Sequence, residues 1–140
     1  MNTNKLLVGA LLGGVAFFLL GWLFYGMLFT DTLASLMPEM AKIQRPGAEI
    51  DMVPMILGNL TTGLLFAYIF ERWASVRSFM GGLVAGATIG FMLAFSVDCI
   101  WHATTNLMTW SGVILDSVIF TVMCGLAGGV IGWWLGYNRK

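Results

Sequence analysis

Three ionisable side chains stand inside apolar stretches of this 140-residue chain: Asp98, His102 and Asp116. A charge in a membrane segment costs roughly 2.5 to 3.5 kcal/mol, so such groups pair with one another or serve a task. Asp98 and His102 are four residues apart and therefore share one face of a helix. Brought together with Asp116, they would form a cluster that binds a cation, a proton or a small polar ligand. His102 is the only histidine, the residue type that changes charge nearest neutral pH.

A fourth polar residue, Asn59, lies at a similar depth in another apolar segment and completes the predicted ligand-binding set of Asn59, Asp98, His102 and Asp116. The same four side chains could instead form only hydrogen bonds between helices and fix the alignment of the helices. Both interpretations remain open from the sequence.

The sequence leaves the identity of any bound metal or other cofactor unknown. It holds no HExxH or comparable zinc spacing, no Walker loop and no Ser/His/Asp triad, so we expect a protein that is not an enzyme. Thioethers suit Cu(I), but methionine also fills irregular gaps between side chains. Five methionines could serve either purpose. Four of them form two M-x-x-M pairs, Met37 with Met40 and Met52 with Met55, and the fifth is Met108.

The composition excludes a water-soluble globular domain. The chain is 59% hydrophobic and 10% charged, with a mean hydropathy of +0.86, whereas soluble domains are about 45–50% apolar and about 25% charged. Seven basic residues balance seven acidic ones. Nothing therefore indicates a nucleic-acid partner, and the expected partner is the lipid bilayer.

Four segments are long enough for membrane helices, which need about 20 mostly apolar residues. They predict an all-α, four-helix transmembrane bundle that forms one integral membrane domain over residues 1–140. The first segment is longer than a signal-peptide core, so we expect it to remain in the mature protein. The segments are residues 5–30, 52–70, 79–101 and 110–137, with a periplasmic loop at 31–51.

The distribution of Lys and Arg predicts the orientation, because cytoplasmic loops carry an excess of them. Five basic residues fall on the side of the two termini and two fall on the other side. Both termini are therefore expected in the cytoplasm, as in a multi-pass protein of a bacterial inner membrane. The first group is Lys5, Arg72, Arg77, Arg139 and Lys140, and the second is Lys42 and Arg45.

The loop at 31–51 has apolar residues at helical spacing, which favours a short amphipathic helix that Pro38 must start or kink. Asp51 is placed to cap the helix that follows. The loop could be a lid over the polar cluster, but we favour a connector that only rests on lipid. The apolar positions are Leu33, Leu36, Met37, Met40 and Ile43.

Small residues recur at every fourth position of the last two segments and predict an antiparallel hairpin packed through glycine ridges. Opposed pairs would have residue numbers that sum to about 218, which would place His102 opposite Asp116. The glycines could instead contact another protomer, and the same choice applies to Gly9, Gly13 and Gly14. The expected pairs are Gly82 with Gly136, Gly86 with Gly132, and Gly90 with Gly128.

The two cysteines, Cys99 and Cys124, are expected to be free. In the predicted alignment Cys124 lies level with Ala94, about 7.5 Å along the helix axis from Cys99. That offset is unfavourable for a disulfide.

The chain resembles a family of small four-helix bacterial membrane proteins of unknown function, frequent in Bacteroidetes-type genomes. The resemblance is carried by GWLFYG at 21–26, by Asp98 followed by TTNL at 104–107, and by GGVIGW at 128–133. It implies an inner-membrane bundle and supplies no catalytic residues.

From these observations we expect a binding or transport protein with an outward-facing polar cavity, in a homo-oligomer. The alternative is a scaffold or accessory subunit that joins a larger membrane complex through its small-residue helix faces.

Overall fold

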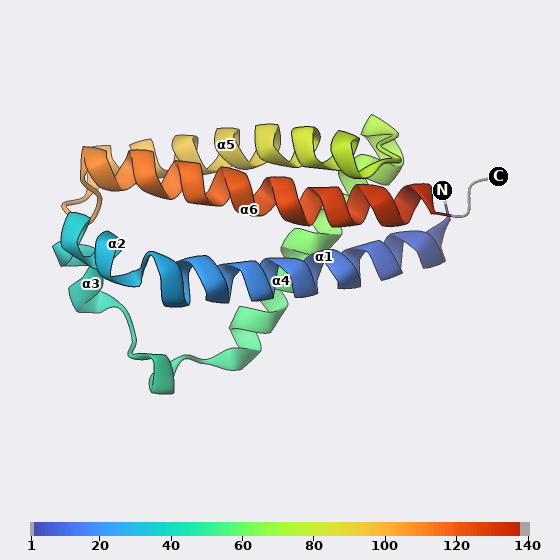
Figure 1. Cartoon of the computed structure of the whole chain (residues 1–140). Helices are drawn as coiled ribbons and strands as arrows, with labels where there is room; N and C mark the ends of the chain where they lie inside the picture. The colour runs from blue at the N-terminus through green and yellow to red at the C-terminus, as the bar shows by residue number, and fades with distance from the viewer. Residues whose placement is uncertain (1, 138–140) are drawn as a thin grey trace.

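The computed structural model describes residues 2–137, and within that range every regular element is a helix. The predicted all-α fold with four membrane-length helices is confirmed, since four helices are long and apolar enough to cross a membrane (Figure 1). These four are Thr3–Leu28, Met52–Ala74, Phe79–Thr104 and Trp110–Gly136.

Two of these helices end in a π-helical turn. Helix α1 (Thr3–Leu23) continues into η1 (Phe24–Leu28), and α4 (Met52–Ile69) continues into η3 (Phe70–Ala74). The turn η3 ends at Ser75, which has a left-handed backbone with φ 49°. Such turns carry one extra residue and alter the direction of the side chains that follow.

The other two long helices, α5 (Phe79–Thr104) and α6 (Trp110–Gly136), form a hairpin joined by residues 105–109. Side-chain caps fix where the helices begin. Asp51 accepts a hydrogen bond from the Val53 N–H at 3.2 Å, so the predicted cap of α4 is confirmed. Ser78 and Thr109 cap α5 and α6 in the same way. A hydroxyl or carboxylate at this position satisfies a backbone N–H that the helix leaves unpaired.

Helix α6 lies at the centre of the bundle and packs against α1, α4 and α5, with α4 crossing behind α1 (Figure 1). In an 18-residue apolar stretch of α6, half of the residues are buried inside the protein, compared with 22–33% of the corresponding stretches of the other three helices. The aromatic rings of Phe17 and Phe66 pack edge to face in the core between α1 and α4, with their centroids 5.3 Å apart. The largest fully buried side chains are Phe17, Phe66, Phe70, Ile131 and Leu135.

The crossing of α1 and α4 is formed by glycines. A Cβ on Gly63 would collide with the Ala10 carbonyl and the Gly14 amide, and one on Gly13 would lie 3.2 Å from the Gly63 Cα. Of the two uses left open for Gly13 and Gly14, the structure therefore shows contact within the chain.

The alignment predicted for the last two helices was wrong by four residues. The glycines meet in pairs whose residue numbers sum to 214, not 218. A Cβ on Gly132 would lie 3.0 Å from the Gly82 Cα, and one on Gly86 would lie 3.2 Å from the Gly128 Cα. Gly136, expected opposite Gly82, lies against the carbonyl of Arg77.

The error has a simple cause. A ridge that repeats every four residues matches its partner equally well after a slip of four, so the glycines alone do not choose between the two alignments. The connection between the two helices determines the alignment, because α5 ends at Thr104 and α6 begins at Trp110. The numbers of these two residues also sum to 214. Gly90 accordingly lies against Cys124 rather than Gly128.

The connection between α1 and α4 contains α2 (Thr30–Leu36), α3 (Pro38–Ile43) and the short 3-10 turn η2 (Gly47–Glu49). Pro38 starts α3, where its missing N–H costs no hydrogen bond.

The connector interpretation favoured from the sequence was wrong for the part that precedes Pro38. Met37 is only 6% exposed and packs against α6 beside Gly112, where a Cβ would lie 2.6 Å from the Met37 sulfur. The Thr109 hydroxyl donates a 2.7 Å hydrogen bond to the Leu36 carbonyl. This segment is therefore attached to the helix bundle.

Candidate functional site

Two of the predicted site residues, Asp98 and Asp116, face each other across the α5–α6 hairpin. Asp98 lies six residues before the end of α5, and Asp116 lies six residues after the start of α6. Both are therefore about 9 Å from the connection, at 1.5 Å per residue. Their equal depth follows from the alignment of the hairpin.

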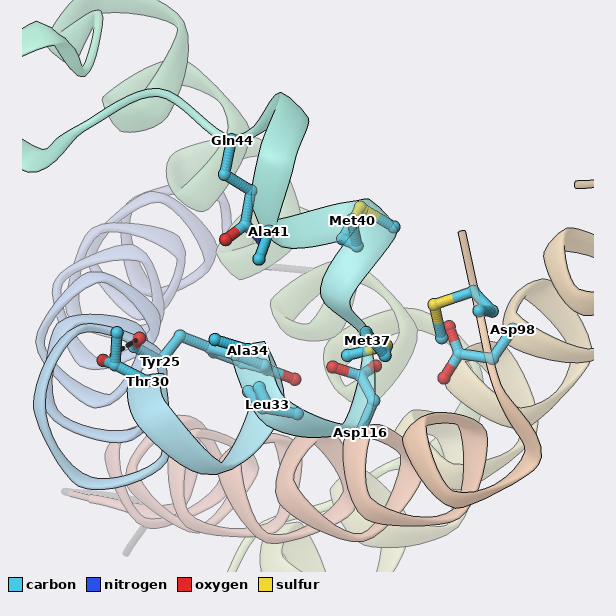
Figure 2. Close-up of a pocket in the computed structure, with 11 residues that line it drawn as sticks. Tyr25, Thr30, Leu33, Ala34, Met37, Met40, Ala41, Gln44, Asp98 and Asp116 are labelled. Carbon is cyan, nitrogen blue, oxygen red and sulfur yellow. Dashed lines mark hydrogen bonds between the residues drawn. The ribbon is translucent and has the colours of Figure 1, made fainter. Parts of the chain in front are cut away.

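Two further helical residues lie at this carboxyl pair. The Ser117 hydroxyl donates a hydrogen bond to Asp98 Oδ2 at 3.4 Å, and Tyr25 lines the same pocket as both carboxyl groups. Figure 2 shows the Tyr25 side chain extended from η1 toward Asp116. Three helices thus contribute to one polar cluster.

The carboxyl pair lines a pocket of about 240 Å³ at the end of the bundle that holds the 105–109 connection (Figure 2). The α2–α3 segment covers it from one side. Its polar groups are the Tyr25 phenol, the Thr30 hydroxyl, the Gln44 amide and the two carboxyls, and three thioethers complete the lining. The lining residues are Tyr25, Thr30, Leu33, Ala34, Met37, Met40, Ala41, Gln44, Asp98, Met108 and Asp116.

His102 does not line this pocket, and its predicted pairing with Asp116 was wrong. Its Nδ1 is hydrogen-bonded to the Met108 carbonyl at 2.7 Å. Its ring lies 4.5 Å from the ring of Trp110. The imidazole therefore holds the 105–109 connection against the end of α5. Because the observed alignment differs from the predicted one by four residues, Asp98 rather than His102 is the neighbour of Asp116.

The predicted cluster of three ionisable groups is accordingly reduced to two. Residues 2–137 hold no group of three or more His, Cys, Asp or Glu side chains that could bind a metal ion. Cys99 and Cys124 are free, as predicted.

Asn59, the fourth predicted ligand residue, is directed elsewhere. Its side-chain amide donates to the Met55 carbonyl one turn back in α4 at 2.8 Å. It lines a separate, largely apolar hollow of about 110 Å³ between α1 and α4. The predicted depth of Asn59 was wrong, because its backbone lies beside Gly14 of α1, eleven residues along that helix from Tyr25 at the pocket.

Tyr25 and Ser117 belong to the cluster, although neither was predicted. Tyr25 is the one phenol within the first apolar segment, and it lies in the π-helical turn η1. π-Helical turns occur often at functional sites. A polar side chain in an otherwise apolar segment was the available signal for both residues.

A second polar cluster, also unpredicted, lies at the opposite end of the bundle. The Arg77 guanidinium pairs with the Glu71 carboxylate at 2.8 Å, and the Glu71 side chain is only 3% exposed. Arg77 also donates to the carbonyls of Phe70 and Val76 at 3.1 and 2.8 Å. These bonds close the π-helical turn between α4 and α5, which indicates a structural role.

No protein-family model, curated protein or solved structure matches this chain. The interpretation of the pocket therefore depends on its geometry and chemistry.

Proposed function

We propose that this protein is a multi-pass protein of a bacterial inner membrane that binds a small cation or a proton at the Asp98–Asp116 pair. The observation that carries the proposal is the placement of two carboxyl groups from opposed helices in one pocket. Two ionised carboxylates at such a site repel each other, and a proton or cation between them removes that repulsion. A purely structural contact would be served better by one acid and a neutral partner.

The pocket would face outward. The basic residues of the described chain favour this orientation, since Lys5, Arg72 and Arg77 lie at the end of the bundle opposite the pocket. The pocket end carries Lys42 and Arg45 together with acidic residues of the α1–α4 connection. Ions outside the cell would thus reach the carboxyl pair past the α2–α3 segment.

Transport through this site would require more than one chain. Four helices are few for a conduction path, so the transport form of the proposal needs a homo-oligomer or a larger membrane complex. The scaffold alternative loses support, because the glycines on which it depended are buried between α5 and α6. These are Gly82, Gly86, Gly90, Gly128 and Gly132.

Infrared difference spectroscopy of the purified protein in nanodiscs tests the proposal directly. Sodium, potassium and magnesium ions, and silver as its nitrate, are added one at a time. The pH is then varied without these cations. We expect a change in the carboxyl stretching bands that Asp98→Asn and Asp116→Asn each abolish and Tyr25→Phe weakens. The exposed Asp31→Asn is the matched control and should leave the change intact. An infrared change that both Asp98→Asn and Asp116→Asn leave intact would refute the proposal.

A further inference from the structure

We propose that the pocket selects a soft monovalent cation of the Cu(I) class, bound by the thioether sulfurs of Met37, Met40 and Met108. The inference rests on the proposed function, because it names the cation that the same pocket would take. It starts from a convergence that the spacing of the residues does not reveal: Met37 and Met40 come from the α2–α3 segment, and Met108 comes from the α5–α6 connection.

The three methionines are held together by the fold. Met37 and Met108 are each 6% exposed and share a buried cluster with Val113, against which Met40 and Cys99 pack. Met37 fits against α6 because residue 112 is glycine. A flexible thioether is thereby fixed in position on the wall of the pocket that also contains the carboxyl pair.

The donor set narrows the class of cation. Structural and catalytic zinc sites use three or four Cys, His or carboxylate ligands. Residues 2–137 hold no group of three such side chains, so the donor set does not suit zinc. Thioether sulfur selects Cu(I) among the biological cations. The Asp98–Asp116 pair supplies the negative charge that neutral thioethers lack, which lowers the cost of holding a cation away from water.

Filling of gaps is the competing explanation for methionine in a core. It does not explain why methionines from two separate segments line one pocket that also contains two carboxyl groups. The chain provides a comparison in Met52 and Met55, which have the same spacing as Met37 and Met40. These two are 46% and 42% exposed on α4 and do not line the pocket.

The test measures silver(I) binding, because Ag⁺ is a soft monovalent cation that needs no reductant. The purified chain in nanodiscs, with Cys99→Ser and Cys124→Ser to remove thiol binding, is titrated with silver nitrate in a calorimeter. We expect one site per chain. Met37→Leu and Met108→Leu should each weaken it by about tenfold or more, equivalent to about 1.4 kcal/mol. Met→Leu preserves side-chain volume, so folding should survive. The Met52→Leu/Met55→Leu control should bind Ag⁺ as the parent does.

The outcomes separate this inference from the proposed function. Silver binding that is absent, or unchanged in the Met37 and Met108 variants, overturns the inference. An infrared change with sodium or pH that Asp98→Asn and Asp116→Asn each abolish would leave the proposed function standing. Silver binding that needs the methionines but is unaffected by Asp98→Asn and Asp116→Asn would uphold the thioether site and count against the carboxyl pair as a cation site. Titration with Cu(I) held reduced by ascorbate should reproduce the silver result.

Discussion

Asp98 of α5 and Asp116 of α6 lie opposite each other, each six residues from the connection that joins the two helices. This relationship depends on the alignment of the hairpin, since a slip of four residues would place His102 beside Asp116 instead. The composition of the candidate site therefore follows from how the two glycine ridges meet.

Chemical cross-linking distinguishes the two alignments. In a background with Cys99→Ser and Cys124→Ser, the pair Asp98→Cys/Asp116→Cys should take up one short bismaleimide as a bridge. The pair His102→Cys/Asp116→Cys should take up two separate reagents, because its cysteines are four residues, about 6 Å, further apart along the axis. Intact-protein mass spectrometry counts the reagents. Bridging confined to the second pair would show that the alignment is wrong.

Alanine at Gly86 should destabilise the protein, whereas alanine at Gly58 should not. A Cβ on Gly86 would collide with the Cys124 carbonyl on α6, but a Cβ on Gly58 would meet nothing within 4 Å. We expect a loss of about 1–3 kcal/mol for Gly86→Ala, as for other overpacked sites. Gly58→Ala should gain up to about 1 kcal/mol of helix propensity. Unfolding by SDS titration measures both, and equal effects would contradict tight packing at Gly86.

Glu71→Gln should cost far more stability than Lys42→Ala. The Glu71–Arg77 pair is buried and fixes the α4–α5 turn, so removal of one charge leaves the other unpaired, at a cost of about 3–5 kcal/mol. The Lys42–Glu39 pair is exposed, and its loss should cost at most about 1 kcal/mol. The same SDS titration compares the two variants. A tolerant Glu71→Gln would mean that hydrogen bonds from Arg77 to the Phe70 and Val76 carbonyls hold the turn on their own.

The sequence predicted those features that depend on local chemistry. Hydropathy predicts the four long helices, Asp51 is a cap because its carboxylate can accept from the next turn, and Pro38 begins a helix because it lacks an N–H. Each of these conclusions needs only a residue and its neighbours in the chain.

The features that sequence analysis missed depend on rotation and alignment between helices. Asn59 lies beside Gly14, away from the level of the carboxyl pair, and lines the hollow between α1 and α4. The imidazole of His102 is hydrogen-bonded to the carbonyl of Met108, a contact that the spacing of residues along the chain does not predict. Tyr25 lines the same pocket as Asp116 although the two residues are far apart in sequence. Periodicity assigns a residue to a helix face but does not say which other helix that face meets.

The central position of α6 has a consequence for biosynthesis. Of the four long helices it is synthesised last, yet α1, α4 and α5 all pack against it. The earlier helices must therefore wait in the lipid or at the translocon with their inner faces unfilled. The carboxyl pair itself is completed only when α6 has been inserted.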